Sequence, residues 1–183
     1  MNLYDKYILP HLLNCTCNNK PFTLQRKKVI PLATGKVLEV GIGSGLNLPF
    51  YQKDSIKEIW GLDPSKELLS MAKKKAKAEN MDVQFLNATA ESIQLDDNYF
   101  DTVVVTYTMC TISNLNQALS EIKRVMKTDG RLIFCEHGAS PEQGVFVWQN
   151  RLNKVWSRIS GGCNINKDIP SIIESSGLIV SQL

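Results

Sequence analysis

The sequence predicts a single α/β domain with a doubly wound, mainly parallel sheet. One chain of 183 residues is long enough for one full core and short for two, so residues 1–183 are taken as one domain. Helical segments separate several of the short apolar runs that are typical of strands, and these runs lie at 37–40, 59–62, 83–86, 102–106 and 131–135. The run at 102–106 does not alternate with polar residues, which indicates a strand buried on both faces, as in parallel sheets.

Composition and charge exclude several classes of protein. Apolar residues make up 43% and charged residues 21%, as in ordinary globular proteins. A net charge of +3 is too small to indicate a nucleic-acid partner, and no apolar run is long enough to predict a membrane span. The five cysteines are scattered and the two histidines lie far apart, so no metal site is expected. Together with the lack of a secretory signal, this predicts reduced thiols and a cytoplasmic protein.

Residues 36–47, KVLEVGIGSGLN, form the most informative stretch of the chain. The pattern predicts a buried strand, a tight glycine turn and the start of a helix. Glycine lets the backbone adopt positive φ and lets a ligand lie directly against it. In the dinucleotide fingerprint G-x-G-x-x-G, however, the sixth position is glycine, and here it is Leu46. The turn therefore argues against a nicotinamide cofactor.

The segment from Glu39 to Gly45 instead resembles the motif E/D-x-G-x-G-x-G of the class I S-adenosylmethionine (SAM) methyltransferases. The resemblance implies a Rossmann-like fold with SAM as cofactor and S-adenosylhomocysteine as product. It also implies roles for the turn residues: Gly41, Gly43, Gly45 and Asn47 near the methionine part, and Glu39 near its amino group.

Asp63 follows the second predicted strand, about twenty residues after the glycine turn. In a doubly wound sheet this position places a carboxylate at the tip of the neighbouring strand, where it can accept both ribose hydroxyls. The adjacent Pro64 is also expected to contact the cofactor. The sequence Asp63-Pro64-Ser65 is also typical of a helix N-cap followed by proline, and the two roles are compatible. A helix is expected over 65–79, with a solvated face of lysines.

Residues 88–101, ATAESIQLDDNYFD, resemble a motif of the quinone-biosynthesis C-methyltransferases. The acidic residue that usually holds the adenine amino group in that family is Thr89 here, which keeps a hydrogen-bond acceptor but loses charge assistance. The resemblance implies that Thr89, the Ala90 backbone and Glu91 contact the cofactor. Thr106, at the end of the fourth strand, completes the predicted cofactor site, and Tyr107 is expected on the substrate side.

The segment 106–114, TYTMCTISN, lacks the D/N/S-P-P-Y/F/W loop and the Pro-Cys pair that DNA methyltransferases carry here. Nucleic acid is therefore not the expected substrate, and Cys110 is expected to be a small buried residue. Asn114 is a predicted N-cap of a helix whose buried face carries Leu115, Leu119, Ile122 and Met126, ending at Gly130 before a strand at 131–135.

His137 lies in the tripeptide Glu136-His137-Gly138 at the tip of the fifth strand, where α/β sheets bind their ligands. It is the candidate general base of this edge, since its side chain titrates near neutrality. The alternative is a structural or substrate-contacting role, because the sulfonium of SAM is already activated and alignment alone can accelerate transfer.

Two helical segments are left open to two interpretations. Residues 1–30 form either a packed amphipathic element or a lid with Tyr4 and Tyr7 as contacts, broken at Asn14–Asn19. Residues 142–160 place apolar side chains on one face and basic ones on the other, which suits either core packing or contact with a membrane surface or lipid substrate. Asn166 is a predicted N-cap, and 178–180 a predicted sixth strand.

Over residues 4–183 the chain resembles small bacterial methyltransferases and the animal alkyl-thiol S-methyltransferases, through YDKYILP, LEVGIGSGLNLPFY, GLDPS, CEHG and GGCN. Members of that group continue into a last antiparallel strand, which is expected to be missing or truncated here, and the animal relatives begin with a membrane anchor that this sequence lacks. The resemblance implies methyl transfer to a small-molecule nucleophile, with a thiol favoured. The alternatives are a phospholipid or quinone-type acceptor, a SAM-binding module without turnover, and an NAD-dependent oxidoreductase. No oligomeric state is indicated.

Overall fold

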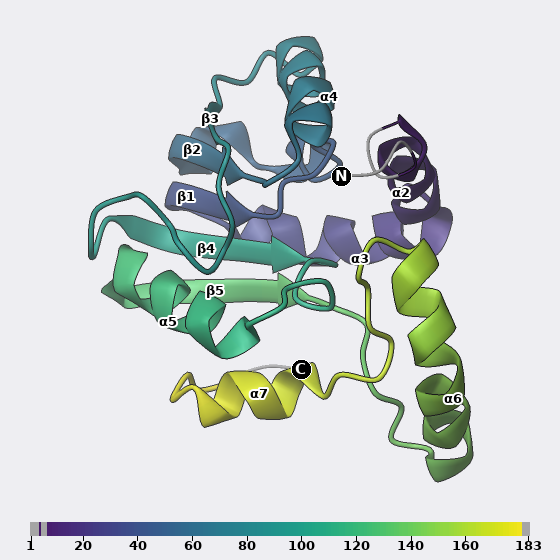
Figure 1. Cartoon of the computed structure of the whole chain (residues 1–183). Coiled ribbons are helices and arrows are strands. Elements are labelled where there is room, and N and C mark those ends of the chain that lie inside the picture. The colour runs from purple at the N-terminus through teal and green to yellow at the C-terminus, as the bar shows by residue number, and fades with distance from the viewer. Residues whose placement is uncertain (1–3, 5–6, 181–183) are drawn as a thin grey trace.

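A five-stranded, all-parallel sheet forms the centre of the molecule (Figure 1), in a computed structural model that describes residues 4 and 7–180. Its strand order is β3-β2-β1-β4-β5. The strands are β1 (Gly35–Val40), β2 (Ile56–Leu62), β3 (Gln84–Leu86), β4 (Phe100–Thr106) and β5 (Met126–Cys135). The chain reverses its winding direction at β1, between β2 and β4, and this is the point where open α/β sheets bind ligands.

Helices cover both faces of the sheet, so the predicted doubly wound α/β fold is confirmed. Val103 and Val105 of β4 face a core shared with α5 (Leu115–Val125) and α7 (Ile169–Ser175). Val104, pointing the other way, joins a second core with η1 (Ile30–Leu32) and α4 (Lys66–Ala78). Burial of every residue from Thr102 to Thr106 explains why β4 carries no polar alternation.

The glycine turn follows β1 as predicted, but the helix expected after it is absent. Gly41, Gly43 and Gly45 all have positive φ, of 74°, 56° and 81°, so the backbone is not helical through the turn. Only two short 3₁₀ helices follow, η2 (Leu48–Phe50) and η3 (Lys53–Ser55), before β2 begins. The N–H groups of Gly41 and Ile42 donate to the carbonyl of Leu62, over 2.8 and 3.0 Å, and so tie the turn to the end of β2.

Two predicted boundaries and one predicted strand are wrong. The helix that Asn114 caps ends at Val125, and β5 begins at Met126, so Gly130 lies inside a strand. Met126 has extended backbone angles and pairs with Phe100 of β4, which ends the helix earlier than its apolar spacing indicated. Residues 178–180 form no strand: they follow Gly177, whose φ is 83°, and the Ile179 side chain is 93% exposed.

The N-caps of two helices also differ from the prediction. Ser65, not Asp63, caps α4, since its hydroxyl accepts a hydrogen bond from the Leu68 N–H over 3.2 Å. Asp168 rather than Asn166 caps α7. The Asn114 cap of α5 is confirmed, with the side chain accepting from the Gln117 N–H. The carboxylate of Asp63 is therefore available for another role.

Two helices lie beyond the carboxyl ends of the strands, on the side toward which the arrows of Figure 1 point: α2 (Leu9–Cys17) and α6 (Gln143–Ile159). α2 runs through most of the polar break that was expected at 14–19, and α3 (Lys20–Val29) follows it. The hydroxyl of Tyr4 donates a 2.6 Å hydrogen bond to the carbonyl of Ile159 at the end of α6. The N-terminal segment therefore reaches the ligand-binding edge of the sheet.

Core packing of α6 was one of two predicted possibilities, and it is wrong for the part of the chain that the structure describes. No residue of α6 is buried. Its apolar stripe is between 40% and 63% exposed and consists of Val145, Trp148, Leu152, Val155, Trp156 and Ile159.

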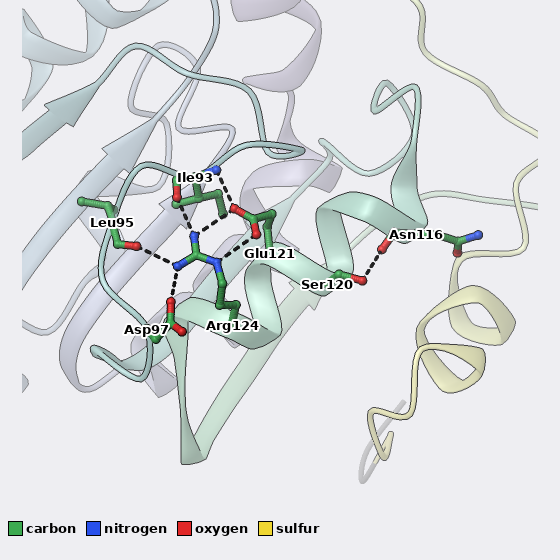
Figure 2. A network of polar contacts seen from close by, with 7 residues as sticks. All are labelled: Ile93, Leu95, Asp97, Asn116, Ser120, Glu121 and Arg124. Carbon is green, nitrogen blue, oxygen red and sulfur yellow. Dashed lines mark hydrogen bonds and ion pairs between the residues drawn. The ribbon is translucent and has the colours of Figure 1, made fainter.

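Arg124 fixes the loop between β3 and β4 to helix α5 (Figure 2). Its guanidinium donates to the carboxylate of Glu121 through Nε and Nη2, each over 2.9 Å. It also donates to the carbonyls of Ile93 and Leu95, over 2.6 and 2.9 Å, and to the carboxylate of Asp97. Bidentate pairing and two carbonyl contacts use most of the guanidinium's donors. The loop is held immediately after residues 89–91, which line the site described below.

Replacing Gly41 with alanine is expected to destabilise the fold more than the same change at Gly43. A Cβ at Gly41 would lie 2.3 Å from the side chain of Thr108, whereas one at Gly43 would meet only the Gly41 carbonyl oxygen, at 4.0 Å. Both changes carry the cost of a left-handed backbone, about 1–2 kcal/mol, and only Gly41→Ala adds overpacking of about 1–3 kcal/mol. Urea unfolding followed by circular dichroism measures both. Equal losses would contradict this account of the turn.

Candidate functional site

A cavity of about 410 Å³ opens at the carboxyl ends of β1, β2 and β4. Its size is in the range of small-molecule sites. The glycine turn, the ends of the three strands and the loops after β3 and β4 form most of its lining. Residues of α2, Arg26 and Gly161 also contribute. All eleven residues predicted to contact the cofactor line it except Gly45, and they are Glu39, Gly41, Gly43, Asn47, Asp63, Pro64, Thr89, Ala90, Glu91 and Thr106.

Glu39 lies at the floor of this cavity and is only 1% exposed. The Asn47 amide donates to its Oε1 over 2.9 Å, and the Tyr51 hydroxyl donates to its Oε2 over 2.8 Å. Burial nevertheless raises the pKa of Glu39 to about 7, since two neutral donors only partly replace the lost water. A buried carboxylate of this kind gains most from a cation placed beside it.

The side chain of Asn47 is fully used in hydrogen bonds within the protein and connects several elements around the cavity. Besides Glu39, its amide nitrogen donates to Oγ1 of Thr106 over 2.9 Å, and its Oδ1 accepts from Nε of Arg26 over 2.9 Å. Arg26 is 4% exposed, and its Nη1 donates to the carbonyl of Cys17 at the end of α2, over 2.6 Å. The network joins α2 and α3 to β1, β4 and the glycine turn.

Asp63 follows β2 directly and is 6% exposed. Its Oδ2 accepts from the N–H of Gly43 over 3.0 Å, and its Oδ1 accepts from the N–H of Ser65 over 2.8 Å. Burial raises the pKa of Asp63, and these two backbone hydrogen bonds oppose the rise. Each carboxylate oxygen retains a lone pair, so the group can still accept a pair of hydroxyls.

The loop after β3 forms a further part of the wall. Thr89 is exposed and Ala90 is buried, and both line the cavity beside Glu91. Oε1 of Glu91 accepts from the N–H of Asn114 over 3.3 Å, which links the loop to the start of α5.

Tyr107, the first residue after β4, has a positive φ of 53° and lines the cavity. Its ring packs edge-on against Phe22 at 4.8 Å, and the Arg26 guanidinium lies 5.0 Å from its centre. The Cys135 thiol donates to its hydroxyl over 3.2 Å. These contacts from α3 and β5 hold a non-glycine residue in the left-handed region, a feature that is concentrated at functional sites.

The other predicted contact residues lie outside the cavity lining. Tyr4 is used by its hydrogen bond to Ile159, and the side chain of Tyr7 is 58% exposed. The N-terminal contribution to the wall comes instead from Leu9, Pro10, Asn14 and Cys17. His137 is also absent from the lining; its Nε2 lies 3.3 Å from Sγ of Cys163, and this contact raises the pKa of His137.

Four residues that sequence reasoning missed support the site. Arg26 and Tyr51 hold the floor network, and the Ser44 hydroxyl donates to Oδ1 of Asn14 over 2.7 Å, closing the turn against α2. Hydrophobic periodicity could not have indicated these residues, but the chemistry of Glu39 could. An acid buried at the end of a central strand needs hydrogen-bond donors, and Asn, Tyr and Arg side chains can supply them.

The methyltransferase domain family matches residues 38–134 of the chain. The chain is 33% identical to thiol S-methyltransferase TMT1B of Homo sapiens over 151 residues, which are 79% of this chain and 61% of that protein. It is 28% identical to demethylmenaquinone methyltransferase of Thermus thermophilus, over 82% of this chain and 73% of that protein. The crystal structure of a SAM-dependent methyltransferase from Aquifex aeolicus has the same fold, with a TM-score of 0.71 and 20% identity, over 94% of this chain and 90% of that one.

The chain belongs to the methyltransferase domain family. Its cofactor is S-adenosylmethionine, as the family indicates. The cavity fits this molecule in two respects: the turn at Gly43 leaves open space where a Cβ would stand, and two buried carboxylates face the turn from neighbouring strands. The chain spans about three-fifths of the length of TMT1B. No helix among residues 7–180 is long and apolar enough to cross a membrane.

The affinity for SAM is expected to fall as the pH drops below about 7. The ammonium group of SAM favours ionised Glu39, whose pKa is about 7, and is itself protonated below its usual pKa of about 8. The ionised carboxylate is present above its pKa and is lost as pH falls through it, so affinity should decrease up to about tenfold per pH unit below 7. Isothermal titration calorimetry across this range measures the effect.

Glu39→Gln should weaken SAM binding and abolish the loss of affinity below pH 7. Glu174→Gln, an exposed change on α7, should leave both the affinity and its pH dependence unchanged. Burial raises the pKa of Glu136 to about 7 as well, so this carboxyl is the other candidate for the titration. A loss of affinity below pH 7 that persists in Glu39→Gln would belong to another group and contradict the role of Glu39.

Proposed function

We propose that this chain transfers the methyl group of SAM to a small-molecule thiol. The observation that carries the proposal is the pair of buried carboxylates, Glu39 and Asp63, at the ends of adjacent parallel strands on either side of the glycine turn. A nucleoside with a cationic amino acid tail offers both a ribose diol and an ammonium group to such a pair.

The roles of the chain's own residues follow from their positions. Asp63 would accept the ribose hydroxyls, and Glu39 would face the ammonium group. Thr89 and the Ala90 backbone would hold the adenine, and the glycine turn would admit the methionine part without side chains in its way. Bound SAM supplies an activated methyl group on a sulfonium, so the chain's task is to align the acceptor and exclude water.

A thiol acceptor is supported by the 33% identity to thiol S-methyltransferase TMT1B. Apart from Glu39, Asp63 and Glu91, which are assigned to SAM, the described cavity lining contains no carboxylate and no histidine. Thiols suit such a wall, because a thiol loses its proton far more readily than a hydroxyl group does and the thiolate is a strong nucleophile. We assign His137 no proton transfer, since it lies outside the cavity lining. A quinone-type acceptor, as in the Thermus relative, is the second candidate.

Transfer of label from methyl-tritiated SAM to a panel of alkyl thiols, sulfide, a demethylated quinone and a phospholipid amine tests the proposal. We expect the label to appear in a thioether product. In Asp63→Ala, kcat/KM should fall by more than about 100-fold, because the change removes two charge-assisted hydrogen bonds to the ribose. Asp82→Ala, an exposed matched change, should retain activity.

Each other result of the panel identifies a different function. SAM binding without thiol labelling, but with labelled quinone or lipid, would reassign the acceptor. Binding with no labelled product at all would indicate a binding module without turnover. Binding of a nicotinamide dinucleotide in place of SAM would contradict the family's cofactor in this chain.

We also propose that α6 contacts a membrane surface, which would bring the cavity close to apolar acceptors. The exposed apolar stripe of α6 lies beside Arg151, Lys154 and Arg158, which are also exposed. Aromatic and aliphatic side chains flanked by basic ones are typical of helices that lie in the interface of anionic membranes.

Co-sedimentation with vesicles that contain anionic phospholipid measures this contact. Trp148→Gln combined with Val155→Gln should release most of the bound protein, because these side chains are 60% and 63% exposed on the stripe. Leu24→Gln, 48% exposed on α3, is the matched control and should bind like the unaltered chain. Equal binding of all three proteins would sink the proposed membrane contact.

A further inference from the structure

Three segments bring thiol and imidazole groups together beside the cavity. Cys110 lies in the loop after β4, His137 follows the end of β5, and Cys163 lies in the turn after α6. The two sulfur atoms and a ring nitrogen of His137 all lie within 4.8 Å of one another, and Nε2 of His137 is 3.3 Å from Sγ of Cys163. Cys110 and Cys163 are 1% and 7% exposed.

These separations lie close to the edge lengths of a tetrahedral zinc site. With Zn–S bonds of about 2.3 Å and Zn–N bonds of about 2.0–2.1 Å, neighbouring ligand atoms lie about 3.5–3.8 Å apart. The observed cluster needs only small side-chain shifts to reach this geometry. We propose that Cys110, His137 and Cys163 bind one Zn²⁺ ion.

The backbone that carries the two cysteines is already fixed. The carbonyl oxygen of Cys110 accepts from both the N–H and the side-chain amide of Asn164, over 3.0 and 3.1 Å. Asn153 of α6 donates to Oδ1 of Asn164 over 2.8 Å and accepts from the N–H of Ile165 over 2.9 Å. The loop that follows Cys110 and the turn that contains Cys163 are therefore joined without any metal, which lowers the entropic cost of assembling the ligands.

The charges around the cluster suit a cation held by two thiolates. Zn²⁺ with two thiolates and a neutral imidazole has no net charge, so little charge would be buried. Lys167 holds the loop from outside, donating to the carbonyls of Met109 and Ile112 over 3.2 and 2.7 Å. Oε1 of Glu136 accepts from the N–H groups of Thr108 and Met109, over 2.6 and 2.9 Å.

The second oxygen of Glu136 provides an independent indication. Oε2 is buried and has no hydrogen-bond partner among the described residues. Glu136 directly precedes His137, and its other oxygen accepts from the N–H of Met109, the residue before Cys110. An unpaired buried carboxylate oxygen is uncommon and calls for a partner. Three protein ligands leave the fourth position of zinc open, and a water bound there could donate to this oxygen.

The site would fix one wall of the cavity. Thr111 and Ile112, which follow Cys110, and Gly161, which precedes Cys163 by two residues, line the cavity. The inference contradicts the expectation from sequence that the chain has no metal site, because the ligands come from three separate segments with no short spacing motif. It does not depend on methyl transfer, since zinc content is measured without substrate.

Metal analysis of the full chain, purified with a thiol reductant after growth with added zinc, tests the proposal. We expect about one zinc per chain. Replacement by Co²⁺ should produce thiolate-to-cobalt charge-transfer absorption and the visible bands of tetrahedral cobalt. Cys110→Ser, Cys163→Ser and His137→Gln should each weaken zinc binding by more than about 100-fold, since even outer-shell changes cost 10–100-fold. Cys15→Ser, at an exposed thiol, should bind zinc normally.

X-ray absorption spectroscopy of the unaltered zinc protein tests the ligands directly, so the test does not depend on variants that fail to fold. It should show two sulfur neighbours at about 2.3 Å and one nitrogen neighbour at about 2.0 Å. A folded, reduced chain that takes up no zinc or cobalt would overturn the proposal. So would a metal environment without sulfur, or a disulfide between Cys110 and Cys163 that persists under reductant.

Discussion

One buried carboxylate organises the ligand-binding edge of this chain. Glu39 stands at the end of the central strand, inside the fold, where an unpaired charge would be costly. Asn47 and Tyr51 each donate to one of its oxygens, and Asn47 is in turn bound by Arg26 and donates to Thr106. Satisfying this one group therefore sets the positions of the turn, of α3 and of the end of β4.

The rest of the cavity is arranged around that floor by similar local contacts. Asp63 closes the turn from the β2 side through the N–H of Gly43, and the Arg124 network secures the loop beyond residues 89–91 (Figure 2). Tyr107 is held between Phe22, Arg26 and Cys135. Because the floor network uses the hydrogen-bonding groups of Asn47 and Tyr51, the turn backbone and the carboxylates of Glu39 and Asp63 are the main polar groups that remain for a ligand at this end of the cavity. Two carboxylates would repel a phosphate, so this arrangement supports the proposed binding of a cationic nucleoside.

Local patterns were enough to predict the features that depend on neighbouring residues. The five strands, the glycine turn, the Asn114 cap and the position of Asp63 at a strand tip follow from runs, spacing and turn chemistry. Features that depend on long-range packing were missed. The sequence left the apolar face of α6 open between core packing and membrane contact, and only the fold shows that this face stays largely exposed in the described chain.

The same reasoning explains the remaining errors. The helix expected after the turn is wrong because the chain forms only the 3₁₀ turn η2 and becomes extended at Tyr51, which the apolar spacing does not reveal. The strand at 178–180 fails because a short apolar run forms a strand only where a sheet edge receives it. Arg26, Tyr51 and the Cys110–His137–Cys163 cluster join residues that are distant in sequence, so single-sequence spacing could not reveal them.

A crystal structure of the chain with S-adenosylhomocysteine tests the central claim most directly. The account predicts the ribose hydroxyls on the carboxylate of Asp63, the amino group beside Glu39, and the sulfur directed toward Tyr107 and Thr111. S-adenosylhomocysteine bound away from the glycine turn, or bound there with its ribose out of reach of Asp63, would contradict it.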